Sequence, residues 1–249
     1  MAYQFSRTPK KVEQIKTTHR LISSGIPCPG TKEVLESLDV YESRSMHGQI
    51  PLVWDSAKDF SIFDLSGNKF IDFTSAIFFS NVGHSNNRVS ESMQEMLKKP
   101  LLGCYAYGNE VRSRYLKKLV EFCGPGFDKA FLMSAGTEAT EAAFKLMRMS
   151  GQSKNKQRLG IISLENNWHG RTTGAQMMSG NIEQKKWIGY SDKDIHHLPF
   201  PYPWTLNNLN GEAFFMHSIE RLVDSGVDPK KDLCGMILET FQGWGAVFY

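Results

Sequence analysis

A glycine turn that opens directly into a helix is the feature of this chain best suited to binding chemistry. Residues 131–148 predict a short buried strand, a turn at Gly136 and an alanine-rich helix. The first amides of a helix have no partner inside the helix and lie at the positive end of its dipole, so they bind phosphate well. Ala135, Gly136 and Thr137 are therefore the candidate phosphate-binding residues, and Thr137 adds a hydroxyl donor.

The turn lacks the signatures of two common nucleotide sites. A P-loop ends in Gly-Lys-Ser or Gly-Lys-Thr, and a dinucleotide-binding turn carries spaced glycines. Residues 131–148 contain neither pattern. A single small phosphorylated cofactor therefore fits the turn better than ATP or NAD.

Four stretches of the chain, taken in order, carry a pattern shared with one family. A hairpin and turn at 53–84 precede Ser-Ala-Gly-Thr-Glu-Ala at 134–139, Asn-Asn-Trp-His-Gly-Arg-Thr at 166–172 and Ile-Leu-Glu-Thr-Phe-Gln-Gly at 237–243. Together these stretches resemble the class III aminotransferases, which bind pyridoxal 5'-phosphate, across residues 30–249. Four motifs in the family's order are far more specific than any one of them.

The resemblance implies roles for the residues of these motifs. Pyridoxal phosphate has a phosphate, a flat ring and an aldehyde that pairs with a lysine. Gly136 and Thr137, beside Ala135, would bind the phosphate. Trp168 would stack on the ring face, and His169 would shape the loop beside it. Without the resemblance, a Gly-Thr turn is commonly only a helix cap, and a lone tryptophan or histidine is commonly a packing or loop residue.

Glu239 and Gln242 lie in the last motif, which in the family is near the cofactor and substrate. Glu239 ends an apolar strand expected at 234–239, where a buried carboxylate is costly without a partner. The alternative is a strand-end residue that faces solvent. Many relatives carry a second glutamate two residues after this motif, where this chain has Trp244. An indole there favours a sugar-like, aromatic or amine substrate over a small dicarboxylate.

The resemblance also implies two groups that this chain does not contain. An aspartate that pairs with the pyridine nitrogen and the Schiff-base lysine would both lie beyond Tyr249. That lysine anchors the aldehyde and moves a proton during amino transfer, so the chain alone is expected to be inactive. Lys145, Lys185 and Lys186 lie in no matching context. We therefore expect the N-terminal fragment of a longer enzyme, with no catalytic lysine assigned.

The motifs do not by themselves choose a reaction. The first hypothesis is transfer of an amino group between an amine or amino acid and an oxo acid. Aminomutase, racemase or decarboxylase chemistry on the same fold is an alternative, and so is a non-catalytic scaffold that pairs with a complementing chain. The resemblance further implies a homodimer with the site at the subunit interface, where Tyr105, Tyr107 and Asn109 resemble part of an interface loop.

Composition argues against other classes of function. The 249 residues include 29 basic and 26 acidic side chains without a dense basic tract, so nucleic acid is not an expected partner. No apolar run approaches the roughly 20 residues that cross a bilayer. The 4 cysteines are widely spaced and follow no signal peptide. We expect reduced thiols, a cytoplasmic protein and no membrane or metal site.

The elements that must position these residues predict an α/β fold. A hairpin is expected around the Ser66-Gly67-Asn68 turn, and amphipathic helices that could cover a sheet are expected near Val89 and Val111. A βαβ unit should follow. Its parts are a strand at 130–133, a helix at 138–149 with Gly151 as its stop, and a strand at 159–164. A helix around 212–224, with Phe215, Ile219, Leu222 and Val223 on one face, should lead to the strand at 234–239.

Alternating elements of this kind predict a mainly parallel, doubly wound sheet with ligands at the carboxyl ends of its strands. The resemblance implies that this sheet is the large domain of the pyridoxal-phosphate transferase fold type I, here incomplete. Residues 1–75 would form a small N-terminal α+β segment with the hairpin. Residues 76–249 would form the partial cofactor-binding domain.

Overall fold

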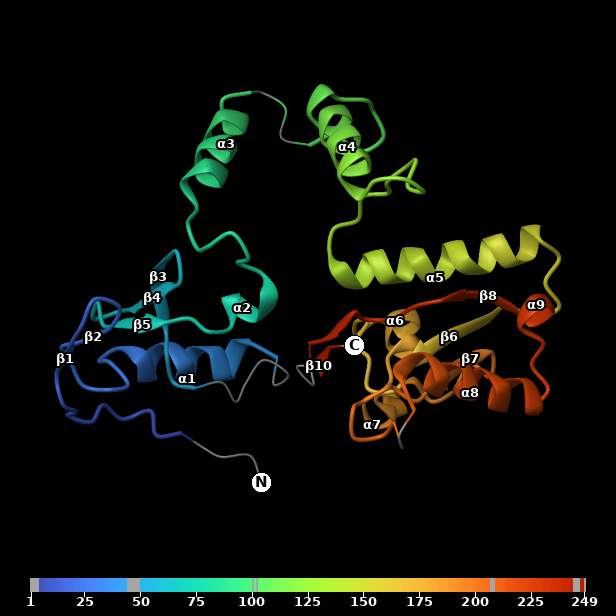
Figure 1. Cartoon of the computed structure of the whole chain (residues 1–249). Coiled ribbons are helices and arrows are strands. Elements are labelled where there is room, and N and C mark those ends of the chain that lie inside the picture. The colour runs from blue at the N-terminus through green and yellow to red at the C-terminus, as the bar shows by residue number, and fades with distance from the viewer. Residues whose placement is uncertain are drawn as a thin grey trace. The chain divides into compact units, whose positions relative to one another are not determined.

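The computed structural model of the chain describes residues 5–43, 50–99, 101, 103–206, 209–243 and 247–248 (Figure 1). Contacts divide the chain into two units, residues 1–110 and residues 111–249, which are described separately below. The boundary expected after residue 75, between the N-terminal segment and the cofactor-binding domain, stays a prediction. Among the described residues, no helix combines the length and the apolar character needed to cross a membrane.

The first unit is built on an antiparallel sheet of five strands in the order β1-β2-β5-β4-β3. The strands are β1 Ile15–Lys16, β2 Leu21–Ile22, β3 Trp54–Lys58, β4 Ser61–Asp64 and β5 Lys69–Ile71. Strands β4 and β5 confirm the predicted hairpin. Asp64 Oδ1 fixes its turn by accepting hydrogen bonds from the amides of Ser66 and Asn68 at 3.0 and 2.9 Å.

A left-handed turn follows the hairpin. The helices of this unit are α1 Thr31–Tyr41, α2 Ser75–Phe78 and α3 Asn87–Leu97, and every residue of α2 has a positive φ. Asp72 holds this segment in place, since its carboxylate accepts from the Thr74 amide at 2.7 Å and the Ala76 amide at 3.0 Å, and lies 2.7 Å from His84 Nε2. Burial acts to raise the pKa of Asp72, but the hydrogen bonds from His84, Thr74 and Ala76 together hold this pKa well below its ordinary value.

Helices α3 and α4 (Glu110–Cys123) confirm the two predicted amphipathic helices. Asn86 caps α3 by accepting from the amides of Arg88 and Val89 at 3.1 and 3.4 Å. Neither helix contains a buried residue. Within the described part of the chain, their apolar faces therefore do not cover a sheet.

The second unit is centred on a parallel sheet of three strands in the order β7-β6-β8 (Figure 1). Its strands are β6 Gly160–Leu164, β7 Ile195–Leu198 and β8 Leu233–Met236. Every residue of the central strand β6 is buried, as expected for a parallel strand covered on both faces. This arrangement confirms an α/β fold with a parallel sheet.

Helices surround this sheet, and a short antiparallel pair follows it. They are α5 Gly136–Ser153, α6 Thr173–Met178, α7 Ile182–Lys185, the 3-10 helix η2 Lys186–Ile188, α8 Gly211–Asp224 and α9 Pro229–Asp232. The antiparallel pair consists of β9 Phe241–Gln242 and β10 Val247–Phe248.

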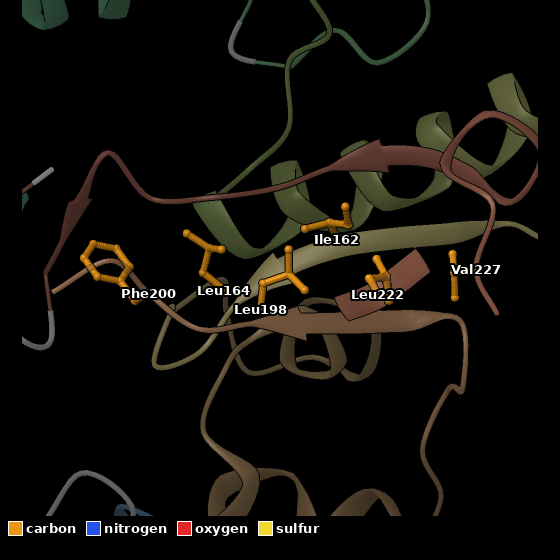
Figure 2. Close-up of a cluster of buried hydrophobic side chains, with 6 residues drawn as sticks. All are labelled: Ile162, Leu164, Leu198, Phe200, Leu222 and Val227. Atoms are coloured by element: carbon orange, nitrogen blue, oxygen red, sulfur yellow. The ribbon is translucent and has the colours of Figure 1, made fainter. Parts of the chain in front are cut away.

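Two apolar clusters pack the opposite faces of the sheet. The first cluster, shown in Figure 2, contains Ile162, Leu164, Leu198, Phe200, Leu222 and Val227, with Phe215 and Ile219 of α8 packed against it. The second contains Ile161, Met178 and Ile195, with Phe144 and Met147 of α5 packed against it. Since Ile161 and Ile162 are successive in β6 and point to opposite faces, α5 covers one face and α8 the other. Val223, which the sequence assigned to the same face of α8, is 46% exposed.

The strand predicted at 130–133 is wrong. These residues adopt no regular structure, and Phe131 is 70% exposed. A strand persists only where a neighbouring strand pairs its backbone groups, and in the described part of the chain neither β7 nor β8 pairs with this segment. The expected βαβ unit is therefore absent at 130–164. The parallel partners of β6 come instead from β7 and β8, which lie later in the chain.

Gly151 was predicted to stop the helix, and this prediction is also wrong. Helix α5 continues through Gly151 to Ser153, and Gly151 is buried. A Cβ atom at this position would lie 2.6 Å from Cys234 Cβ and 3.1 Å from Leu159 Cδ2. The glycine therefore lets α5 approach strand β8 closely. Strand β8 itself ends at Met236, earlier than the expected end at Glu239.

Replacing Gly151 by alanine tests this explanation. If the glycine were only a tolerated break in the helix, Gly151→Ala would raise the free energy of unfolding by up to about 1 kcal/mol, because alanine is the better helix former. We expect a decrease of about 1–3 kcal/mol, because the added methyl group overlaps Cys234. Chemical denaturation followed by circular dichroism measures the change. Gly211→Ala in α8, where a Cβ would meet no atom within 4 Å, is the matched control. A Gly151→Ala variant at least as stable as the parent would contradict the expectation.

Candidate functional site

The predicted phosphate-binding turn lies at the start of α5. The helix begins at Gly136 after Ala135, an extended N-cap residue that offers no side-chain acceptor. Ala135 and Gly136 are exposed and Thr137 is half-buried. A Cβ atom built at Gly136 meets no atom within 4 Å, so open space adjoins the first turn. The turn therefore has room for an anionic group next to amides that have no partner inside the helix.

The loop that carries Trp-His-Gly-Arg-Thr lies against this turn. Gly170 has a φ of 136°, and a Cβ atom there would lie 2.5 Å from Thr137 Oγ1 and 2.9 Å from Thr137 Cγ2. One turn further along α5, Thr140 Oγ1 donates to the carbonyl oxygen of His169 at 2.6 Å. The structure thus brings the segments 134–139 and 168–172 into contact.

Glu239 joins the third segment to the same loop. Its Oε2 accepts a hydrogen bond from the Trp168 amide at 2.7 Å. Burial raises the pKa of the Glu239 carboxyl, although hydrogen bonds from the amides of Trp168 and Gly243 act to lower it. Glu239 is therefore a half-buried carboxylate with the backbone partners that such a group requires.

The Trp168 side chain is half-buried and is held by a neighbouring cation. Arg171 Cζ lies 5.3 Å from the centroid of the indole ring, within the range of a cation–π interaction. From sequence, Arg171 could equally be a surface cation or a brace for the loop. Its position over the indole ring favours the second interpretation.

Gln242 is fully buried and connects three parts of the second unit. Its Nε2 donates to the carbonyl oxygen of Glu165 at 2.9 Å and to Asn167 Oδ1 at 2.8 Å, and its Oε1 accepts from the Tyr202 hydroxyl at 2.7 Å. Asn167 and Tyr202 were not singled out from sequence. The position of Asn167 inside a motif was an available signal, whereas no pattern marked Tyr202.

His169 is buried beneath the loop. Its backbone amide donates to Ser179 Oγ at 2.9 Å, and its Nε2 lies 3.3 Å from Ser163 Oγ. Burial, and to a lesser degree the neighbouring His197, lower the pKa of His169 to about 4. The imidazole is therefore neutral near pH 7, with its environment supplied by protein groups.

Two of the lysines considered from sequence bind other parts of the chain, and the third is exposed. Lys185 Nζ donates to the carbonyl oxygen of Ser179 at 2.8 Å and lies 3.1 Å from His197 Nε2, and burial lowers its pKa. Lys186 pairs with Glu183 at 2.6 Å, and Lys145 is exposed on α5.

Two other sequence predictions lie elsewhere. Trp244 falls outside the described residues, so its proposed effect on substrate choice stays a prediction. Tyr105, Tyr107 and Asn109 belong to the first unit, and Tyr105 is 98% exposed. Their assignment to an interface also stays a prediction.

Comparison with known proteins adds a family and a fold. The family model described as "Aminotransferase class-III" matches residues 42–249. The mitochondrial acetylornithine aminotransferase of Saccharomyces cerevisiae is 31% identical over 191 residues, which cover 74% of this chain and 41% of that protein. The ornithine aminotransferase of the same yeast is 29% identical over 217 residues, which cover 86% of this chain and 48% of that protein. The chain thus spans less than half the length of either curated relative.

Solved structures show the same fold. The taurine:2-oxoglutarate aminotransferase of Bifidobacterium kashiwanohense, solved in complex with PLP and glutamate, matches with a TM-score of 0.73 and 24% identity. The match covers 85% of this chain and 48% of that one. An (S)-enantioselective omega-transaminase of Thermomicrobium roseum matches with a TM-score of 0.74 and 20% identity, over 88% of this chain and 52% of that one. These likenesses confirm the predicted α/β fold of the transaminases, present here in part.

Replacing His169 by glutamine tests the consequence of its burial. An unfolded histidine has a pKa of about 6.5, whereas that of folded His169 is about 4. As the pH falls, the unfolded chain therefore takes up the proton first. The stability that His169 contributes is present above pH 6.5 and is lost as the pH falls through this window to about 4.

Relative to His169→Gln, the parent chain should lose up to about 1.4 kcal/mol of unfolding free energy per pH unit in that window. Urea denaturation at a series of pH values measures this difference. His217→Gln, which removes an exposed side chain of α8, serves as the control and should follow the parent. Parallel pH profiles for the parent and His169→Gln would rule out the buried neutral imidazole.

Proposed function

The chain belongs to the class III aminotransferase family, and from this premise we propose that it supplies part of a pyridoxal-phosphate-dependent aminotransferase. The whole protein would move an amino group between an amine or amino acid and an oxo acid. One observation carries the proposal, namely that three family segments far apart in sequence meet beside the start of α5. Gly170 touches Thr137, and Glu239 accepts from the Trp168 amide at 2.7 Å.

The residues present fit the phosphate of the cofactor. Helix α5 has 18 residues, so its dipole is well developed, and its first turn adjoins open space. We assign the phosphate to Gly136 and Thr137 together with the neighbouring Ala135. The Thr137 hydroxyl would add a hydrogen bond of the strength typical of charged partners.

The residues around the loop would orient the cofactor ring and exclude water from it. Trp168 is assigned to the ring, with Arg171 bracing the indole and His169 supporting the loop from below. Gln242 would fix the loop through Asn167, and Glu239 is assigned to the substrate side of the same loop. When bound, pyridoxal phosphate supplies an electron sink for the carbon that loses its proton. The chain's own part is to bind and orient these groups.

The partners and location of the whole protein are proposals of the same kind. We assign it a small-molecule amino donor, an oxo acceptor and a second copy of itself. The apolar side chains of α3, including Val89, Met93 and Leu97, are exposed in this chain, which supports a covering partner. All four cysteines are free thiols, which supports a reducing compartment such as the cytoplasm. One relative is named as mitochondrial, so the family is not restricted to the cytoplasm.

Titration with pyridoxal 5'-phosphate, followed by tryptophan fluorescence, tests the phosphate assignment. We expect this compound to bind more tightly than pyridoxal, which lacks the phosphate. Thr137→Val should weaken its binding about 10-fold, because a hydrogen bond to a charged group contributes about 1.5 kcal/mol or more. Thr8→Val, at an exposed position of the first unit, is the matched control. Equal binding of the two compounds, or no effect of Thr137→Val, would refute the assignment.

The reaction is tested on the whole protein that contains this chain. Adding a donor without an acceptor should release about one equivalent per site of the carbonyl compound that the donor becomes on losing its amino group, as the first half of a ping-pong cycle. Ornithine, acetylornithine and 4-aminobutyrate form a first donor panel, because relatives are named for them. The 249-residue chain alone should release none. A donor that is racemised, rearranged or decarboxylated without release of that carbonyl compound would instead favour the alternative chemistries.

A further inference from the structure

Glu141 lies on α5 one turn after the phosphate-binding turn, and the assignments above give it no role. Its Oε1 accepts hydrogen bonds from the amides of Gly174 and Ala175 at 2.9 and 3.0 Å. The Thr172 hydroxyl donates to the same oxygen. One carboxylate on α5 therefore binds three donors at the start of the neighbouring helix α6.

Gly174 is shaped to this carboxylate. The residue is buried, and a Cβ atom on it would lie 3.1 Å from Glu141 Cδ and closer still to Oε2. Any side chain at 174 would therefore push the carboxylate away. The fit between Gly174 and Glu141 indicates a close contact that the backbone itself permits.

The contact meets a need of α6 that its own sequence does not meet. The N-cap residue Thr172 makes no side-chain capping bond, so the amides of Gly174 and Ala175 would lack a local acceptor. Glu141 supplies that acceptor from another helix, and its negative charge complements the helix dipole. The cap of α6 is thus provided by α5.

Glu141 extends a row of contacts along one face of α5. Thr137, Thr140 and Glu141 are spaced as residues on one side of a helix. They meet Gly170, the carbonyl oxygen of His169 and the start of α6 respectively. Both ends of the 169–175 segment are therefore held against the helix that begins with the phosphate-binding turn.

We infer that Glu141 is a positioning residue that fixes the loop of Trp168 relative to the start of α5. The phosphate-binding turn and the ring-stacking loop then move as one body, so that a single cofactor can meet both. This inference rests on the proposed function insofar as turn and loop serve the same cofactor. The contact itself is independent of any ligand.

Hydrogen exchange in the unliganded chain tests the contact. In Glu141→Ala and in Glu141→Asp, which cannot reach α6, the amides of Gly174 and Ala175 should exchange about 10-fold faster or more. Glu141→Gln keeps both the reach and an acceptor oxygen, so it should retain more protection than the aspartate variant. Comparing the aspartate and glutamine variants therefore separates the effect of side-chain length from the effect of charge. Glu138→Gln, also on α5 but bonded to the Ser134 amide at 3.0 Å, should leave both amides unchanged.

Titration of the same variants with pyridoxal 5'-phosphate tests the purpose of the contact. Glu141→Ala and Glu141→Asp should bind it several-fold more weakly, and Glu141→Gln should recover part of the loss. Unchanged exchange in Glu141→Asp would overturn the contact. Faster exchange with unchanged affinity would overturn the positioning role. A parent chain that binds no pyridoxal 5'-phosphate would refute the phosphate assignment on which the inference rests, while exchange would still decide the contact.

Discussion

The backbone amides at the start of a helix need hydrogen-bond acceptors, and the helices of the second unit obtain them in different ways. Asn210 and Asp228 precede helices α8 and α9 as N-cap residues, and their side chains accept from amides in the first turn of each helix. Helix α6 receives its acceptor from Glu141 of another helix. Helix α5 begins instead after Ala135, which has no acceptor to offer, and open space adjoins Gly136. At the start of this 18-residue helix, where no side chain caps the first amides, an external anion can accept their hydrogen bonds.

Close backbone approach is the second constraint, and it explains two glycines of the loop, Gly170 and Gly174. At Gly170 a side chain would collide with Thr137, and at Gly174 it would collide with Glu141. Gly170 also has a φ of 136°, a backbone conformation that residues other than glycine rarely adopt. The segment from 169 to 175 can therefore lie flat against α5. Glycine is required here by the neighbouring helix as much as by the turn itself.

The sequence predicted local elements well and long-range partners poorly. Strand β6 and helix α8 follow from apolar runs and periodicity, which act over a few residues. The strand expected at 130–133 failed because a strand depends on a neighbour that local pattern does not specify. Likewise the motifs named Trp168 and Glu239, but the hydrogen bond between them joins residues 71 positions apart. Gly151 could be recognised as special, yet its reason lies in Cys234 on another strand.

Two carboxylates hold the loop of Trp168 from opposite ends, and they differ in their effect on the stability of the fold. Glu141 accepts from amides of α6 that would otherwise lack an acceptor, so it stabilises the fold as well as holding the loop. Glu239 is half-buried, and its pKa is raised chiefly by burial. A raised pKa means that the folded state takes up the proton more readily than the unfolded state, so the stability linked to this proton is lost as the pH rises through that pKa. Ionisation of Glu239 therefore weakens the fold, while the same side chain fixes the Trp168 amide. A group that reduces stability where it orients a loop is explained more readily by a role in the site than by a role in packing.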